Sequence, residues 1–228
     1  MISSCNGRKE VKPKYCLRID SNGGPVESIS SADYVPTIEI EIQNLIVRAR
    51  SGIGEAGMSF IIVDVEADGP IPAEYSMVCF GAVLFNEALD QSFYAQTRPI
   101  SQRFIPEALA VSGFSHEQHL AFDDPKMAME KFAVWIEECS KGHPVFVSDN
   151  LAFDWQFINY YFHRFLGCNP FGFSGRRIGD LYAGLVKDIH KATDWKKYRV
   201  TQHTHNPVDD ARGNAEALRR FKELGLKI

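Results

Sequence analysis

An apolar run in the chain ends in two acidic residues that share one face. Residues 60–63 read Phe-Ile-Ile-Val, and Asp64 and Glu66 follow with one residue between them. In a β-strand, residues i and i+2 point to the same side, so both carboxylates project together from the strand end. Like charges at this spacing repel each other, so the pair predicts a site that holds something cationic.

Two further acidic residues follow loops at the starts of expected helices. Asp154 ends the segment SDNLAFD, and Asp210 ends the segment HTHNPVDD. If the strand end and the two helix starts converge, the four carboxylates form a cluster that hard divalent cations such as Mg²⁺ or Mn²⁺ neutralise. Two such ions about 4 Å apart stabilise both the attacking and the leaving oxygen of a phosphoryl displacement.

A histidine lies close to the last of these acids. His205 precedes Asp210 by five residues, and histidine suits proton transfer from water at neutral pH. Pro207 fits the first turn of the following helix, which leaves His205 on the loop before it. Each of the five residues alone would be an ordinary surface charge, but together they predict metal-dependent hydrolysis.

The regular elements needed to position these residues begin near Met58. Strand-like patterns occupy 59–65, 75–85, 91–98, 145–147 and 176–179, and helical patterns occupy 106–112, 125–140, 153–166 and 207–224, with another helix after the fifth strand. The first three strands are close enough for an antiparallel meander. The strand–helix alternation that follows predicts an α/β fold with a mixed sheet and helices on its faces.

Residues 1–57 differ in composition from the rest. They are polar, and only Ile38–Ile42 alternates like a strand. The string GIGEAG at 52–57 matches a dinucleotide-binding loop, but it leads into a strand where that loop must open a helix. We therefore expect an N-terminal extension of uncertain structure at 1–57 and one domain at 58–228.

The overall composition narrows the class of protein. A net charge of −4 argues against nucleic-acid binding through a general basic coat. The five cysteines contain no C-x-x-C pair, which favours free thiols in a reducing compartment. No apolar run approaches the roughly 20 residues of a membrane span, so we expect a soluble, cytoplasmic protein with no membrane partner.

From Met58 to its end the chain resembles the DEDDh group of 3′-to-5′ exonucleases in the ribonuclease H-like superfamily, which includes ribonuclease T, oligoribonuclease and proofreading subunits. The matching segments are VDVEADGP, SDNLAFDWQFI and HNPVDDARGNAEAL, in the family's order. The resemblance implies a ribonuclease H-like five-stranded mixed sheet with helices on both faces. It also implies that two Mg²⁺ or Mn²⁺ ions bind Asp64, Glu66, Asp154 and Asp210, that His205 is the general base, and that Asp209 is a bystander.

Substrate contacts are less well defined by the sequence. Ala67 and Asp68 stand where many relatives carry a threonine that contacts the substrate 3′ end. A basic region before His205 contains Lys196, Lys197 and Arg199, which could track a phosphate backbone. In the aromatic helix, Trp155 and Phe162 are weak candidates for base stacking, whereas the face with Phe153, Phe157, Tyr161 and Phe165 is expected in the core.

These residues together predict a divalent-metal-dependent exonuclease that releases nucleoside 5′-monophosphates from the 3′ end of single-stranded RNA or DNA. The stand-alone form and the likeness of DVEADGP to ribonuclease T slightly favour RNA. Two alternatives stay open: a DNA-trimming enzyme of repair or proofreading, and a non-catalytic module that binds nucleic acid. Members of the family are often dimers, so a homodimer is also expected.

Overall fold

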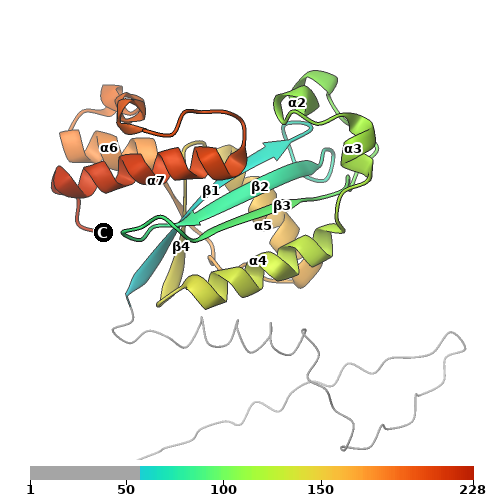
Figure 1. Cartoon of the computed structure of the whole chain (residues 1–228), viewed down its shortest axis with the longest axis horizontal. Coiled ribbons are helices and arrows are strands. Elements are labelled where there is room, and N and C mark those ends of the chain that lie inside the picture. Colours follow the sequence, from blue (N-terminus) through green and yellow to red (C-terminus); the bar gives the residue numbers. More distant parts are fainter. Residues whose placement is uncertain (1–56) are drawn as a thin grey trace, which may run out of the picture. The chain divides into compact units, whose positions relative to one another are not determined.

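The computed structural model describes residues 57–228 (Figure 1). Predictions made for the preceding segment, including the strand at 38–42 and all but the last residue of the glycine-rich string at 52–57, lie outside the described residues. The first described strand starts at Met58. Within the described range, no helix combines the length and apolar character needed to span a membrane.

A five-stranded mixed sheet forms the centre of the described chain. Its strands are β1 (Met58–Ala67), β2 (Met77–Leu84), β3 (Ser92–Gln96), β4 (His143–Ser148) and β5 (Gly175–Arg177), arranged in the order β3-β2-β1-β4-β5. The three consecutive strands pair antiparallel, whereas β4 runs parallel to β1 and β5 runs parallel to β4. The sequence-based prediction of a meander joined to parallel strands is confirmed.

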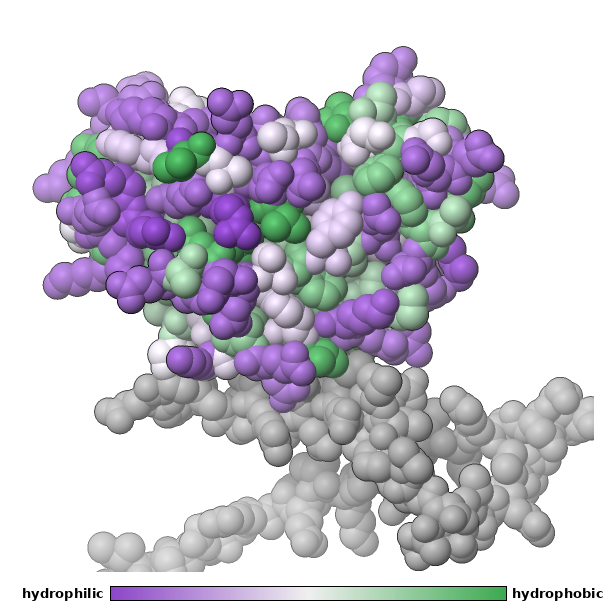
Figure 2. Space-filling model, viewed as in Figure 1, coloured by the Kyte–Doolittle hydropathy of each residue, from purple (hydrophilic) through white to green (hydrophobic). Residues whose placement is uncertain are grey.

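Helices cover both faces of this sheet (Figure 1). The longer ones are α4 (Pro125–Cys139), α5 (Leu151–Leu166), α6 (Ile178–Val186) and α7 (Pro207–Glu223). Buried side chains of α4 and α5 pack with one face of β1, and those of α6 and α7 pack with the other. The surface on the side of α6 and α7 is mostly hydrophilic (Figure 2).

Several short helices were not resolved by sequence patterns. Helix α2 (Pro106–Val111) matches its prediction, but α3 (His116–Leu120) is five residues long, too short to show a helical period. It begins with a capping box between Ser115 and Gln118. The segment between α6 and His205, which includes the basic region, contains two 3₁₀-helices, η1 (Ile189–Lys191) and η2 (Asp194–Tyr198). Strand β5 also ends at Arg177, and α6 follows it directly.

The aromatic face of α5 lies in the core as expected. Phe157 and Tyr161 are fully buried, and Phe153 and Phe165 pack partly exposed against the same cluster. Phe162 is also fully buried, with its ring stacked on that of Phe132 at 5.6 Å. The hypothesis that Phe162 stacks on a base is therefore wrong, because this ring has no surface to offer a ligand.

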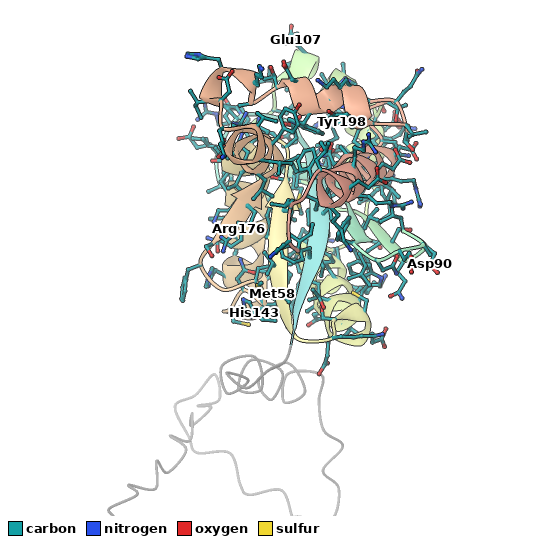
Figure 3. All side chains as sticks on the ribbon, turned by 90° about the vertical axis from the view of Figure 1, so that its left-hand side faces the viewer. Met58, Asp90, Glu107, His143, Arg176 and Tyr198 are labelled. Carbon is teal, nitrogen blue, oxygen red and sulfur yellow. The ribbon has the colours of Figure 1, made fainter. Side chains whose placement is uncertain are left out.

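The parallel strands fix which end of the sheet carries the acidic residues. Met58 and His143, the first residues of β1 and β4, lie together at one end (Figure 3). Pairing between these strands stops at Ile62 and Val147, so the last residues of β1 extend beyond β4. Asp64 and Glu66 lie on this extension, at the end of the sheet where α5 begins.

Helix α7 approaches the sheet closely at one glycine. Gly81 of β2 is the register partner of Asp64 on β1. A β carbon built at Gly81 would lie 2.5 Å from the backbone nitrogen of Val208 and 2.6 Å from the carbonyl carbon of Pro207. Real side chains do not approach backbone this closely, so only glycine allows the first turn of α7 to sit beside Asp64.

We expect Gly81→Ala to lower the free energy of unfolding by about 1–3 kcal/mol, because the added methyl group overlaps backbone atoms that cannot rotate away. Gly184→Ala in α6 is the matched control, since a β carbon there meets no atom within 4 Å. The control should be neutral or stabilising by about 0.5–1 kcal/mol. Urea unfolding measures both, and equal midpoints for the two variants would contradict the close approach.

Candidate active site

The first two acidic residues occupy the extended end of β1. Asp64 and Glu66 share a face with Ile62, which packs in the core beneath α6 and α7. The pairing of β1 with β2 shifts register between Glu66 and Ala67. Such a bulge re-aims the side chains that follow it, so Glu66 is the last β1 residue in regular alternation with Asp64.

Asp154 comes from the first turn of α5 and is 3% exposed. Burial raises the pKa of this carboxyl group, whereas the neighbouring Ser148 side chain and the Val65 backbone lower it. The Val65 backbone is available to it because β4 no longer pairs with β1 at this point. The second oxygen, Oδ2, is buried without a hydrogen-bond partner. A buried oxygen left in this state is costly unless another group satisfies it.

Asp210 comes from the first turn of α7 and is 1% exposed. Its Oδ1 accepts hydrogen bonds from Arg199 Nη2 at 3.0 Å and from the Thr204 N–H at 3.1 Å. Its Oδ2 accepts from the His205 N–H at 3.0 Å and lies 2.7 Å from His203 Nδ1. The carboxylate therefore holds the preceding loop as well as the helix start.

The loop that carries His205 is tied to α7 at a second point. Glu216 accepts hydrogen bonds from the backbone N–H groups of Val200 and Thr201, at 2.9 and 2.7 Å, and from the Thr201 hydroxyl. His205 itself adopts a left-handed backbone with φ of +61°. Such a conformation in a non-glycine residue persists only where surrounding contacts impose it.

His205 faces the acidic cluster from this loop. Its Nδ1 lies 3.4 Å from Glu66 Oε1, and its side chain is 46% exposed. The imidazole is thus held at one nitrogen by the site and can still be reached from solvent. The structure thus places His205 on the loop before α7 and beside Glu66.

The carboxylates are close enough to alter one another's protonation. Ligand oxygens of Asp64, Glu66 and Asp210 lie within 4.8 Å of one another. Burial raises the pKa of Asp64 well above its usual value, and the charges of Asp154, Asp210 and Glu66 raise it further. Burial likewise raises the pKa of Glu66, against the opposing charge of His205, and raises the pKa of Asp154 to about 8.

A divalent cation fits this donor set. The four side chains offer only carboxylate oxygens, the ligands that Mg²⁺ and Mn²⁺ prefer. Asp154 Oδ2 is a buried acceptor with no partner, and a bound cation would also remove the repulsion that raises the pKa of Asp64. The candidate ligands are Asp64, Glu66, Asp154 and Asp210.

Two of the residues expected to contact substrate are enclosed by protein. Ala67 is 6% exposed and packs in the core beneath α4 and α5. Asp68 has no exposed surface; its Oδ1 accepts from the Ser76 N–H at 2.5 Å, and its Oδ2 lies 3.7 Å from His119 Nδ1. Burial raises the pKa of Asp68 to about 6. These contacts stabilise the turn after β1, and neither side chain has the exposed surface that a substrate contact requires.

The remaining expected contacts differ in how available they are. Trp155 is partly buried with its ring against Phe146 at 5.2 Å, so it mainly extends the core. Lys196 is half exposed and pairs with Asp149 at 2.9 Å, and Lys197 is exposed beside the Tyr198 ring. Arg199 is 10% exposed and pairs with Asp210, so its charge serves the acidic cluster directly.

Two residues that shape the site, His203 and Glu216, were not predicted from the sequence. His203 lies two residues before His205, its ring centroid is 4.4 Å from that of His205, and its Nδ1 contacts Asp210. The His-x-His spacing was visible in the sequence, but nothing there showed that both rings turn toward the same carboxylate. Glu216 was missed for the same reason, since its role depends on where the preceding loop runs.

Known proteins resemble this chain in sequence and in fold. No family model matches it. A protein of Escherichia coli named 3′-5′ DNA exonuclease Cap18 is 40% identical over 176 residues, which cover 74% of this chain and 94% of the relative.

Solved structures share the fold at lower identity. The nuclease domain of 3′hExo, described as a DEDDh family member bound to rAMP, aligns with a TM-score of 0.60 and 19% identity over 73% of this chain and 92% of that domain. Escherichia coli ExoI in a complex with single-stranded DNA aligns with a TM-score of 0.58 and 15% identity over 74% of this chain, but over only 41% of its own length.

We expect Asp64→Asn to raise the melting temperature of the protein in EDTA. A carboxyl group whose pKa is raised by folding destabilises the folded state once pH exceeds the unfolded value of about 4. The amide removes that penalty, so the difference between variant and wild type should widen from pH 4 toward pH 8.

In Mn²⁺, we expect the wild-type protein to have a higher melting temperature than Asp64→Asn, the reverse of the order in EDTA. The ion should raise the melting temperature of wild type by mass action and stabilise Asp64→Asn much less, because one candidate ligand is lost. Asp209→Asn, a neighbouring acid outside the cluster, should respond to Mn²⁺ like wild type. Differential scanning fluorimetry measures the melting temperatures of all three proteins. A lower melting temperature for Asp64→Asn than for wild type in EDTA would contradict the inferred repulsion between Asp64 and the neighbouring carboxylates.

Proposed function

The chain is a 3′-5′ exonuclease of the DEDDh family, and we propose that it shortens single-stranded DNA from the 3′ end in a reaction that depends on divalent metal ions and releases nucleoside 5′-monophosphates. The observation that carries this proposal is the convergence of four carboxylates from β1, α5 and α7 with the half-exposed His205 beside Glu66. A module that only binds nucleic acid has no use for this combination.

The four carboxylates hold the metal in this proposal. When bound at Asp64, Glu66, Asp154 and Asp210, two Mg²⁺ or Mn²⁺ ions supply Lewis-acid polarisation of the scissile phosphate and neutralise its developing charge. The protein contributes a fixed set of oxygens on three separate elements. Because Asp64 and Glu66 lie on a rigid central strand, the position of the phosphate is set by the sheet.

His205 acts as the general base. Its Nδ1 lies 3.4 Å from Glu66 Oε1, so a proton held there leaves Nε2 with the free electron pair. Nε2 then accepts the proton of the attacking water, and the half-exposed ring releases it to solvent. The Asp210 carboxylate positions this ring by accepting the His205 backbone N–H.

DNA is the proposed substrate, although the sequence alone slightly favoured RNA. The 40%-identical relative carries the name of a DNA exonuclease, and the alignment spans nearly all of that protein. This supports DNA more directly than the likeness of one segment to ribonuclease T supports RNA. A single strand is supported by the ExoI complex, which shares the fold and was solved with single-stranded DNA.

In this proposal, basic side chains at the C-terminal end of η2 and just after it guide the strand. Arg199 pairs with Asp210, and Lys197 lies two residues earlier with its ammonium group exposed beside Tyr198. Lys196 pairs with Asp149, which lies at the start of the loop before α5 and close enough to raise the pKa of Asp154. Cations at this edge attract phosphates toward a site that is itself acidic.

The proposal predicts stepwise shortening of 5′-labelled single-stranded DNA in Mg²⁺ or Mn²⁺, with no product in EDTA. Asp64→Asn should abolish cleavage, and His205→Ala should slow it by about 10²–10⁴-fold, the usual contribution of a general base. A time course on matched DNA and RNA oligonucleotides, resolved on denaturing gels, measures rate and substrate preference together.

Asp209→Asn is the matched control for this experiment, because it removes an acid next to Asp210 without touching the cluster. It should cleave at the wild-type rate. Full activity in His205→Ala would exclude the proposed base, and faster cleavage of RNA than of DNA would overturn the substrate while leaving the exonuclease in place.

The basic edge makes a separate prediction about salt. Lys197→Ala should raise KM for single-stranded DNA more than it lowers kcat, and the slope of log KM against log salt should become shallower by about 0.7, the value for one lost phosphate contact on a single strand. Lys131→Ala on α4 is the control, since this exposed lysine pairs only with Asp123 among the ion pairs of the described residues. Equal slopes in the two variants would remove Lys197 from the strand path.

A further inference from the structure

A second set of potential metal ligands overlaps the acidic cluster. Nitrogen atoms of His203 and His205 and an oxygen of Asp210 all lie within 4.8 Å of one another. From this arrangement we propose that the loop before α7 forms a distinct site for a borderline transition-metal ion, with Zn²⁺ as its typical occupant, and that occupancy of this site switches the enzyme off.

The ligand types favour Zn²⁺ over the ions of the carboxylate cluster. Imidazole nitrogen suits Zn²⁺, whereas Mg²⁺ prefers oxygen ligands. Two histidines and one carboxylate leave a fourth tetrahedral position for water, as in many three-ligand zinc sites. Neighbouring ligands around a tetrahedral zinc ion lie about 3.4 Å apart for bonds of about 2.1 Å. Donor atoms within 4.8 Å therefore need only small rotations to close around it.

Closure around an ion requires rotation of the histidine rings. The side chains of His203 and His205 are 54% and 46% exposed, so packing does not enclose either ring, whereas Asp210 is 1% exposed. His203 Nδ1 already lies 2.7 Å from Asp210 Oδ2. Zinc binding would displace the proton between these two atoms and use both of them as ligands.

Charge around the site is compatible with a cation. Arg199 contacts Oδ1 of Asp210 at 3.0 Å, so it faces the oxygen that the histidines do not use. Glu66 Oε1 lies 3.4 Å from His205 Nδ1. Its negative charge attracts a divalent ion to the histidine pair.

The inhibitory effect rests on the proposed function, but the binding does not. An ion held by the histidine pair takes the free electron pair from His205, which is the proposed base. It also takes an oxygen of Asp210, which is a candidate ligand for the activating ions. The same ion thus removes two parts of the proposed machinery at once.

Isothermal titration calorimetry with ZnCl₂ in millimolar Mg²⁺ tests the binding. Wild type, Asp64→Asn and the control His190→Ala, an exposed histidine on η1, should bind with similar Kd, whereas His203→Ala should bind about tenfold more weakly or worse, as for a lost metal ligand. Co²⁺ in place of Zn²⁺ should give visible absorption of a tetrahedral ion in wild type and lose it in His203→Ala.

His203→Asn keeps a polar partner for Asp210 and serves as a second variant, with circular dichroism confirming that each protein is folded. Wild-type Zn²⁺ affinity in both His203 variants would overturn the site. Loss of affinity in Asp64→Asn with retention in the His203 variants would overturn it as well, because the ion would then occupy the carboxylate cluster.

Inhibition by Zn²⁺ is measured as the rate of DNA cleavage in Mg²⁺. The rate of each variant is normalised to its own rate without zinc. The Zn²⁺ concentration for half inhibition should rise about tenfold in His203→Ala, in step with the calorimetry. Equal half-inhibition concentrations in wild type and His203→Ala would overturn the proposal that Zn²⁺ at this site inhibits the enzyme. If no variant cleaves DNA, the proposed function fails, yet the calorimetry still decides whether the zinc site exists.

Discussion

The contact between the first turn of α7 and Gly81 is the constraint on which the site depends. Pro207 and Val208 pass so close to β2 that no side chain fits between them. Gly81 is the register partner of Asp64. The contact therefore brings Asp210, the third residue after Pro207, beside the end of β1. A shift of α7 by the width of a methyl group would separate the carboxylates that we propose share an ion.

Electrostatic repulsion is the cost of this arrangement. Burial and mutual proximity raise the pKa of Asp64 and Asp154, which means that the ionised cluster destabilises the folded protein. Arg199, His203 and His205 surround Asp210 with donors, and the guanidinium of Arg199 supplies part of the missing positive charge. A strained backbone at His205 and a buried, unpartnered oxygen on Asp154 fit the same view of a site shaped for a ligand.

Asp210 belongs to both proposed metal sites. It lies near carboxylate oxygens of the sheet residues Asp64 and Glu66, and also near the imidazole nitrogens of the loop residues His203 and His205. Hard and borderline cations prefer these donors differently. A single carboxylate can therefore belong to an activating site and to an inhibitory site, and the loop held by Glu216 keeps both within reach.

The order of elements could be inferred from the sequence because hydrophobic periods and helix signals are local. The apolar run of β1, Pro207 at the start of α7 and the spacing of His205 from Asp210 are all encoded within a few residues. The short helix α3 escaped because five residues show no period, and Phe162 was misjudged because a helical face does not reveal how far it is covered.

The sequence by itself therefore determined the elements, the acidic residues at their ends and the resemblance that joins them. Only the tertiary structure decided that Asp68 is enclosed beneath α3, that Arg199 serves Asp210, and that His203 turns toward the same carboxylate as His205. The physical reason is that residue spacing sets the direction of a side chain within its own element, whereas burial and charge pairing depend on packing between elements distant in the chain.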